Sequence, residues 1–105
     1  MCYFICEKCG EKIYPIDGFL SWQREDGILA NFQIAHRKYS DPQNNACVTL
    51  FEVVDEDGFM GFIKYLIDCW GDGLTLEGHE SLLRVFTKMY EYRNQRLKDL
   101  LYANE

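Results

Sequence analysis

The chain has 105 residues, of which 48% are hydrophobic and 15% aromatic, and its formal net charge is −6 at pH 7. This length predicts one domain, and this composition excludes a disordered segment, which would be poor in aromatic residues. The acidic balance disfavours non-specific nucleic-acid binding, because the phosphate backbone repels an acidic protein.

The excess negative charge lies in the middle third of the chain. Residues 39–75 hold seven acids and one base, whereas residues 1–38 and 76–105 are each balanced. The N-terminal residues lack the basic region of a signal peptide, and the most apolar stretch is interrupted by charges and too short to span a bilayer. We therefore expect a cytoplasmic protein without a membrane segment, in which the five cysteines stay reduced.

The first half of the chain predicts a small antiparallel sheet. Residues 2–5, 12–14 and 19–24 have strand character. Asp26-Gly27, between apolar residues, is a strong hairpin signal and predicts a return strand over residues 28–36. The more apolar face of that strand carries Ile28, Ala30, Phe32, Ile34 and His36. His36 is therefore expected on the buried side, at the end of the strand.

The second half predicts two helices. After a loop over residues 39–46, residues 48–54 fit either a strand or a short helix. The helix expected from Phe59 to Trp70 is apolar on most of its circumference, so it should lie at the centre of the core.

A last amphipathic helix is expected from about Leu76 to about Tyr102, with Thr75 as its N-cap. It would be roughly 40 Å long. Because a domain of this size is smaller than that, the helix should either break near residues 92–94 or pack its end on a partner chain.

Together these segments predict an α+β fold: a small antiparallel sheet that carries a zinc knuckle in the N-terminal half, packed against two C-terminal helices. A single domain is expected over residues 1–105. Its β-rich, metal-binding part would span residues 1–47 and its helical part residues 56–103.

The candidate metal site begins at Cys6-Glu7-Lys8-Cys9-Gly10. The two-residue gap lets both sulfurs turn toward one point, and zinc is the usual metal for thiolate and imidazole ligands. His36 is the predicted third ligand and Cys47, which ends the loop, the predicted fourth. Cys2 and Asp41 remain open as alternatives to Cys47.

Other interpretations of the cysteine pair are two reduced thiols at a turn, or a redox pair. The strand-like residues that follow argue against the second, because thioredoxin-type pairs lie at the start of a helix.

The segment Cys6 to Gly10 resembles the knuckle of zinc-ribbon proteins, in which a cysteine pair at a hairpin tip supplies half of a structural site. The resemblance covers about five residues and implies a structural metal. The second knuckle of those proteins is absent here, so His36 and Cys47 would have to replace it.

No catalytic motif is recognisable, neither a nucleophile elbow, nor a phosphate-binding glycine loop, nor a metal-hydrolase helix. We therefore expect a non-enzymatic, zinc-stabilised binding or regulatory module. Its partner would be another protein, or a second copy bound through the last helix.

Two alternatives remain. One is a metalloenzyme whose zinc is held by Cys6, Cys9 and His36 alone, with water as the fourth ligand. The other is a nucleic-acid accessory factor that uses the bases of the last helix, Arg84, Lys88, Arg93, Arg96 and Lys98.

Overall fold

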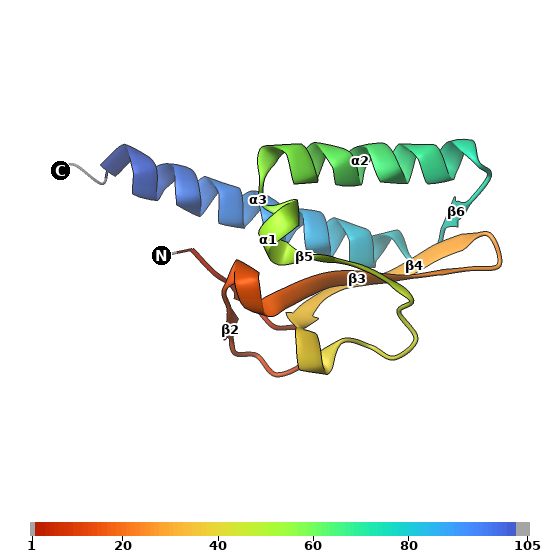
Figure 1. The fold of residues 1–105 in the computed structure, drawn as a ribbon, viewed down its shortest axis with the longest axis horizontal. Coiled ribbons are helices and arrows are strands. Elements are labelled where there is room, and N and C mark those ends of the chain that lie inside the picture. The colour runs from red at the N-terminus through yellow and green to blue at the C-terminus, as the bar shows by residue number, and fades with distance from the viewer. Residues whose placement is uncertain (1, 103–105) are drawn as a thin grey trace.

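A computed structural model describes residues 2–102 (Figure 1). The elements in chain order are β1 (Phe4–Ile5), β2 (Lys12–Ile13), the 3₁₀ turn η1 (Pro15–Asp17), β3 (Gly18–Glu25), β4 (Ile28–His36), the 3₁₀ turn η2 (Arg37–Tyr39), β5 (Ala46–Thr49), α1 (Leu50–Val53), α2 (Glu56–Gly71), β6 (Thr75–Leu76) and α3 (His79–Tyr102). The mixture of helices with a small, largely antiparallel sheet agrees with the α+β prediction, and so does the C-terminal helix. Residue 103, where the helical part was predicted to end, lies outside the described residues.

The main sheet has four strands in the order β5-β3-β4-β6. Strands β3 and β4 form the predicted hairpin, and both turn residues, Asp26 and Gly27, have positive φ angles of 52° and 74°. This is the mirror-image turn that matches the twist of the two strands, and it explains why Asp-Gly is favoured there. Strand β5 pairs antiparallel with β3, whereas β6 runs parallel to β4. Strands β1 and β2 form a separate antiparallel pair.

Strand β4 does not keep the simple alternation that the sequence predicts. Asn31 has a φ of 59°, and the register of the β3–β4 pairing shifts between Ser21 and Gln23. On one side of such an irregularity, residues expected on one face of the sheet lie on the other face. Leu29 is therefore buried while Ile28 and Ala30 are half-buried, the reverse of the prediction. Beyond the irregularity, Phe32 and Ile34 are fully buried, as expected.

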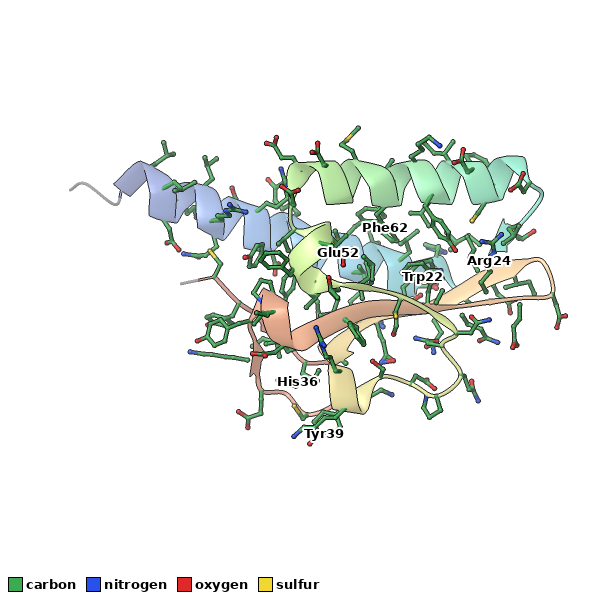
Figure 2. All side chains as sticks on the ribbon, in the orientation of Figure 1. Trp22, Arg24, His36, Tyr39, Glu52 and Phe62 are labelled. Carbon is green, nitrogen blue, oxygen red and sulfur yellow. The ribbon has the colours of Figure 1, made fainter. Side chains whose placement is uncertain are left out.

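Helices α2 and α3 pack over the same face of the sheet (Figures 1 and 2). Helix α3 contacts β4 directly and buries Val85 and Met89. Helix α2 rests on aromatic side chains: the ring of Phe62 lies 5.5 Å from that of Trp22 and 6.0 Å from that of Phe86. Aromatic side chains thus form the part of the hydrophobic core on which α2 packs.

The prediction that the apolar helix lies at the core's centre is wrong. Only Phe62 and Cys69 of α2 are buried, and Trp70, at the helix's end, is 78% exposed. Because α3 lies next to β4, α2 forms the outermost layer. Part of its apolar surface is therefore exposed to solvent.

The undecided segment at residues 48–54 combines both alternatives. Strand β5 ends at Thr49, whose hydroxyl accepts a hydrogen bond from the Glu52 amide (3.2 Å) and caps the one-turn helix α1.

Helix α3 is a single helix of 24 residues, about 36 Å long, in a molecule whose longest dimension is 52 Å. It shows no break near residues 92–94. It begins at His79 and not near Leu76 as predicted. Thr75, the expected N-cap, belongs to β6. Within residues 2–102, no helix combines the length and the apolar character that crossing a membrane requires.

Candidate metal centre

The cysteine pair lies in the tight connection between β1 and β2. The Cys6 amide donates to the Glu11 carbonyl (2.9 Å), and the Gly10 amide donates to the Cys6 carbonyl (3.0 Å), which closes a compact loop. Gly10 has a φ of 75°, a conformation that glycine adopts without strain. The sequence Cys-x-x-Cys-Gly therefore makes a turn in which the two thiols lie on one side.

The loop is attached to strand β4. The Glu7 amide donates to the Ile34 carbonyl (3.0 Å), two residues before His36. This contact brings the cysteine loop to the end of β4, where His36 pairs with Gly18 of β3. Residues about 30 positions apart in sequence thus meet at one corner of the sheet.

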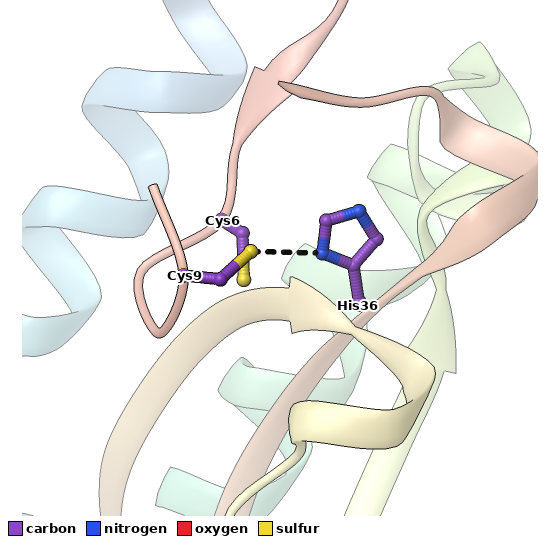
Figure 3. A group of neighbouring side chains, drawn as sticks. All are labelled: Cys6, Cys9 and His36. Atoms are coloured by element: carbon purple, nitrogen blue, oxygen red, sulfur yellow. Dashed lines mark hydrogen bonds between the residues drawn. The ribbon is translucent and has the colours of Figure 1, made fainter. Parts of the chain in front are cut away.

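Cys6, Cys9 and His36 converge there (Figure 3). One ligand atom from each lies within 4.8 Å of the other two, a group close enough to bind a metal ion. The sulfur of Cys9 is 3.4 Å from Nδ1 of His36. Two ligands at usual zinc–sulfur and zinc–nitrogen bond lengths in a tetrahedron are about 3.6 Å apart. His36 was predicted to meet the cysteine pair because of its position at the end of its strand. The structure confirms that Cys6, Cys9 and His36 lie close together.

The His36 ring is held by its other nitrogen. Nε2 lies 3.2 Å from the carbonyl oxygen of Lys12. Since a carbonyl can only accept, Nε2 is the donor in this contact, and in a neutral ring Nδ1 keeps its lone pair toward the sulfurs. Metal-binding histidines are usually fixed by a second hydrogen bond of this kind.

Cys6 is the buried member of the group, with 2% of its surface exposed. Burial alone would raise the pKa of its thiol. Backbone amides of His36, Cys9 and Lys8 outweigh this effect by donating toward the sulfur, and together with a hydrogen bond to the His36 side chain they lower the pKa from 9.0 to about 6. The Lys8 amide, for example, lies 3.4 Å from Sγ. The backbone here favours a thiolate, the form that binds metals.

Cys47 does not join this group. It pairs with Ser21 on β3, whereas His36 pairs with Gly18 on the other side of that strand. Two strand spacings across the sheet and three residues along it separate Cys47 from His36 by roughly 14 Å. The expected return of the 39–46 loop toward His36 fails because β5 pairs with β3 and not with β4.

The two alternatives to Cys47 also lie elsewhere. Asp41 accepts a hydrogen bond from the Asn31 side chain (3.0 Å), in the middle of β4 and five residues before His36. The thiol of Cys2 lies 3.4 Å from a carboxylate oxygen of Asp99 on α3. Among residues 2–102, the metal-ligand group thus contains three side chains.

Glu7 is a residue of this centre that the sequence did not single out. Its carboxylate accepts from the Ile34 amide and forms an ion pair with Arg84 of α3, and Lys88 lies 3.9 Å away. It joins the cysteine loop to both β4 and α3. The partner Arg84 is 77 positions away, so no local pattern could have revealed the contact.

Glu7→Gln is expected to lower the free energy of unfolding by about 1–2 kcal/mol, because a charged partner of Arg84 is lost at a largely buried position. Urea unfolding measures this effect. Glu11→Gln changes the same charge at an exposed position in the same segment and should stay within about 0.5 kcal/mol of the parent. Equal losses in both variants would show that Glu7 does not hold the loop.

Comparison of the chain with protein-family models, curated proteins and solved structures finds no match.

Proposed function

We propose that this protein is a small binding module whose N-terminal loop is held by a zinc ion on Cys6, Cys9 and His36. The convergence of these three ligand atoms within 4.8 Å carries the proposal. The donated hydrogen bonds to Cys6 and the Lys12 contact of His36 support it, because each favours the metal-binding form of its residue. Zinc would join the β1–β2 loop to the end of β4.

A binding role is supported by apolar side chains on the outer surfaces of both helices. Met60, Ile67 and Trp70 of α2 are at least 59% exposed, and Leu97, Leu100 and Leu101 near the end of α3 at least 53%. Large apolar surfaces of this kind are typical of sites that bind another protein. The partner would be a protein, or a second copy that meets the end of α3.

Zinc removal is expected to lower the midpoint of thermal unfolding by about 10–20 °C, because metal bound only to the native state adds a few kcal/mol of stability. Metal analysis of protein purified in reducing buffer without added zinc should find about one equivalent. Less than a few tenths of an equivalent, together with a midpoint that chelator leaves unchanged, would refute the zinc site.

A second candidate function is an enzyme with an open zinc position. The observation that favours it is the three-membered ligand group, since catalytic zinc sites use three protein ligands and structural ones four. Zinc supplies a polarising centre and an activated water in such enzymes. If the protein turns over a substrate, the rates of two variants test this function. A Cys47→Ser variant that keeps the parent rate, together with a His36→Ala variant that loses activity, would favour an enzyme over the binding module.

The bases of α3 support a nucleic-acid role less well. Arg84 is paired with Glu7, Lys88 donates to the Ile5 carbonyl (3.3 Å), and the guanidinium of Arg93 lies 5.3 Å from the Phe59 ring centre. Three of the five bases are therefore engaged within the molecule.

A further inference from the structure

Among residues 2–102, the group of metal ligands has no fourth member. The remaining cysteines have other surroundings: Cys2 lies beside Asp99, Cys47 is on β5 and Cys69 is buried in α2. Zinc bound to nitrogen and sulfur ligands takes four donors. Within the described part of the chain, three converge, so one position is left for a donor from outside.

Two oxygen groups near the ligands have other partners. The carboxylate of Glu7 is bound to the Ile34 amide and to Arg84. The Lys12 carbonyl accepts from His36. Tyr39 presents its ring to His36, with a centre-to-centre distance of 6.0 Å and nearly perpendicular planes.

The charge around the centre favours an anionic donor. A zinc ion with two thiolates and a neutral imidazole has no net charge. Four exposed bases flank the ligands along the chain: Lys8, Lys12, Arg37 and Lys38. Three of them lie over aromatic rings, Lys12 over Tyr3, Arg37 over Phe19 and Lys38 over Tyr39, and these contacts leave their positive charge in place. Of the two acids in the same stretches, Glu7 is neutralised by Arg84 and Glu11 is exposed. The exposed side chains of these two stretches therefore carry a net positive charge, which favours a negatively charged ligand.

The centre is open on the Cys9 side. Cys6 is buried and His36 half-buried, whereas Cys9 is exposed. A donor can reach the cluster beside Cys9 without unfolding the loop.

We propose that the fourth position binds an external thiolate. This inference rests on the proposed zinc site and deepens it. A thiolate suits the centre because zinc with sulfur ligands accepts further sulfur, and the flanking bases favour the ionised form of an approaching thiol. Binding forms one metal–sulfur bond, releases a bound water and passes the thiol's proton to solvent, without oxidation or reduction.

Cobalt(II) replaces zinc as a spectroscopic probe in the test, with a phosphine as the only reductant. The probe ligand is 2-mercaptoethanol, and ethylene glycol is its oxygen-only control. Thiolate binding should raise the sulfur-to-cobalt charge-transfer absorbance about 1.5-fold and saturably, because two thiolate ligands become three. Ethylene glycol should leave the absorbance unchanged.

Variants test the role of the flanking bases. Lys8→Gln with Lys38→Gln should weaken 2-mercaptoethanol binding about fourfold, or about twofold for each charge removed. Lys64→Gln is the matched control, because it removes an exposed base on α2, on the far side of the sheet, and should leave binding unchanged.

The outcomes separate the two proposals. If cobalt already shows the absorbance of three thiolate ligands before any thiol is added, the proposal of an external thiolate is wrong. It is also wrong if 2-mercaptoethanol leaves the absorbance unchanged. Either result leaves the proposed metal site intact. Failure to bind cobalt or zinc overturns both proposals.

Discussion

Cys9→Ser is expected to weaken zinc binding about a hundred- to a thousandfold. Structural zinc sites bind their metal with about 10–16 kcal/mol, so each of a few ligands contributes roughly 3–4 kcal/mol. Cys9 is exposed and its sulfur lies 3.4 Å from Nδ1 of His36, so the substitution removes a ligand without opening a cavity in the core. Competition with a zinc-binding dye measures the change.

Cys47→Ser is the matched control for this result. Cys47 is also an exposed cysteine, but β5 holds it across the sheet from His36. The variant should keep the zinc affinity of the parent protein. If Cys47→Ser releases the metal as Cys9→Ser does, the site is closed by Cys47 and both the open position and the external thiolate are wrong.

Gly58→Ala is expected to destabilise the fold by about 3 kcal/mol or more. Gly58 lies in the first turn of α2, packed directly against α1. A Cβ atom there would overlap the carbonyl oxygen of Glu52 and lie 2.7 Å from its carbonyl carbon. Both atoms belong to the backbone, so relief requires α2 to move away from α1.

Gly61→Ala supplies the control within the same helix. A Cβ atom at Gly61 would meet no atom within 4 Å apart from its chain neighbours and the backbone of its own helix, and the residue is exposed in the helix interior. Alanine should therefore stabilise the protein by about 0.5–1 kcal/mol, since it favours helix more than glycine does. Opposite signs at the two positions, measured by urea unfolding, are the expected result. A loss at both would mean that helix geometry, and not the α1 contact, determines the cost.

Local patterns predicted the parts of the fold that depend on neighbouring residues. Asp26-Gly27 gave the β3–β4 hairpin, and its register places His36 opposite Gly18 at the sheet's corner. The Cys-x-x-Cys-Gly turn placed two thiols together. These features need only turn chemistry and strand periodicity, which a single sequence contains.

Features that depend on distant pairing were missed. Nothing near Cys47 shows that β5 pairs with β3, which takes this cysteine away from His36. The irregularity at Asn31 was also invisible, because it depends on the partner strand's register.

The place of α2 was misjudged for a related reason. Its apolar circumference suggested a central helix, but two helices share one face of the sheet and α3 has the contact with β4. Trp70 is left exposed as a consequence. Hydrophobicity alone does not separate a core helix from one whose apolar side faces a partner.

The most direct test of the central claim is X-ray absorption spectroscopy of the zinc-loaded protein, prepared with a phosphine as the only reductant. We expect two sulfur ligands at about 2.3 Å and two nitrogen or oxygen ligands at about 2.0–2.1 Å, contributed by Cys6, Cys9, His36 and a water. A first shell of three or four sulfurs, or one without sulfur, would contradict the three-residue metal centre.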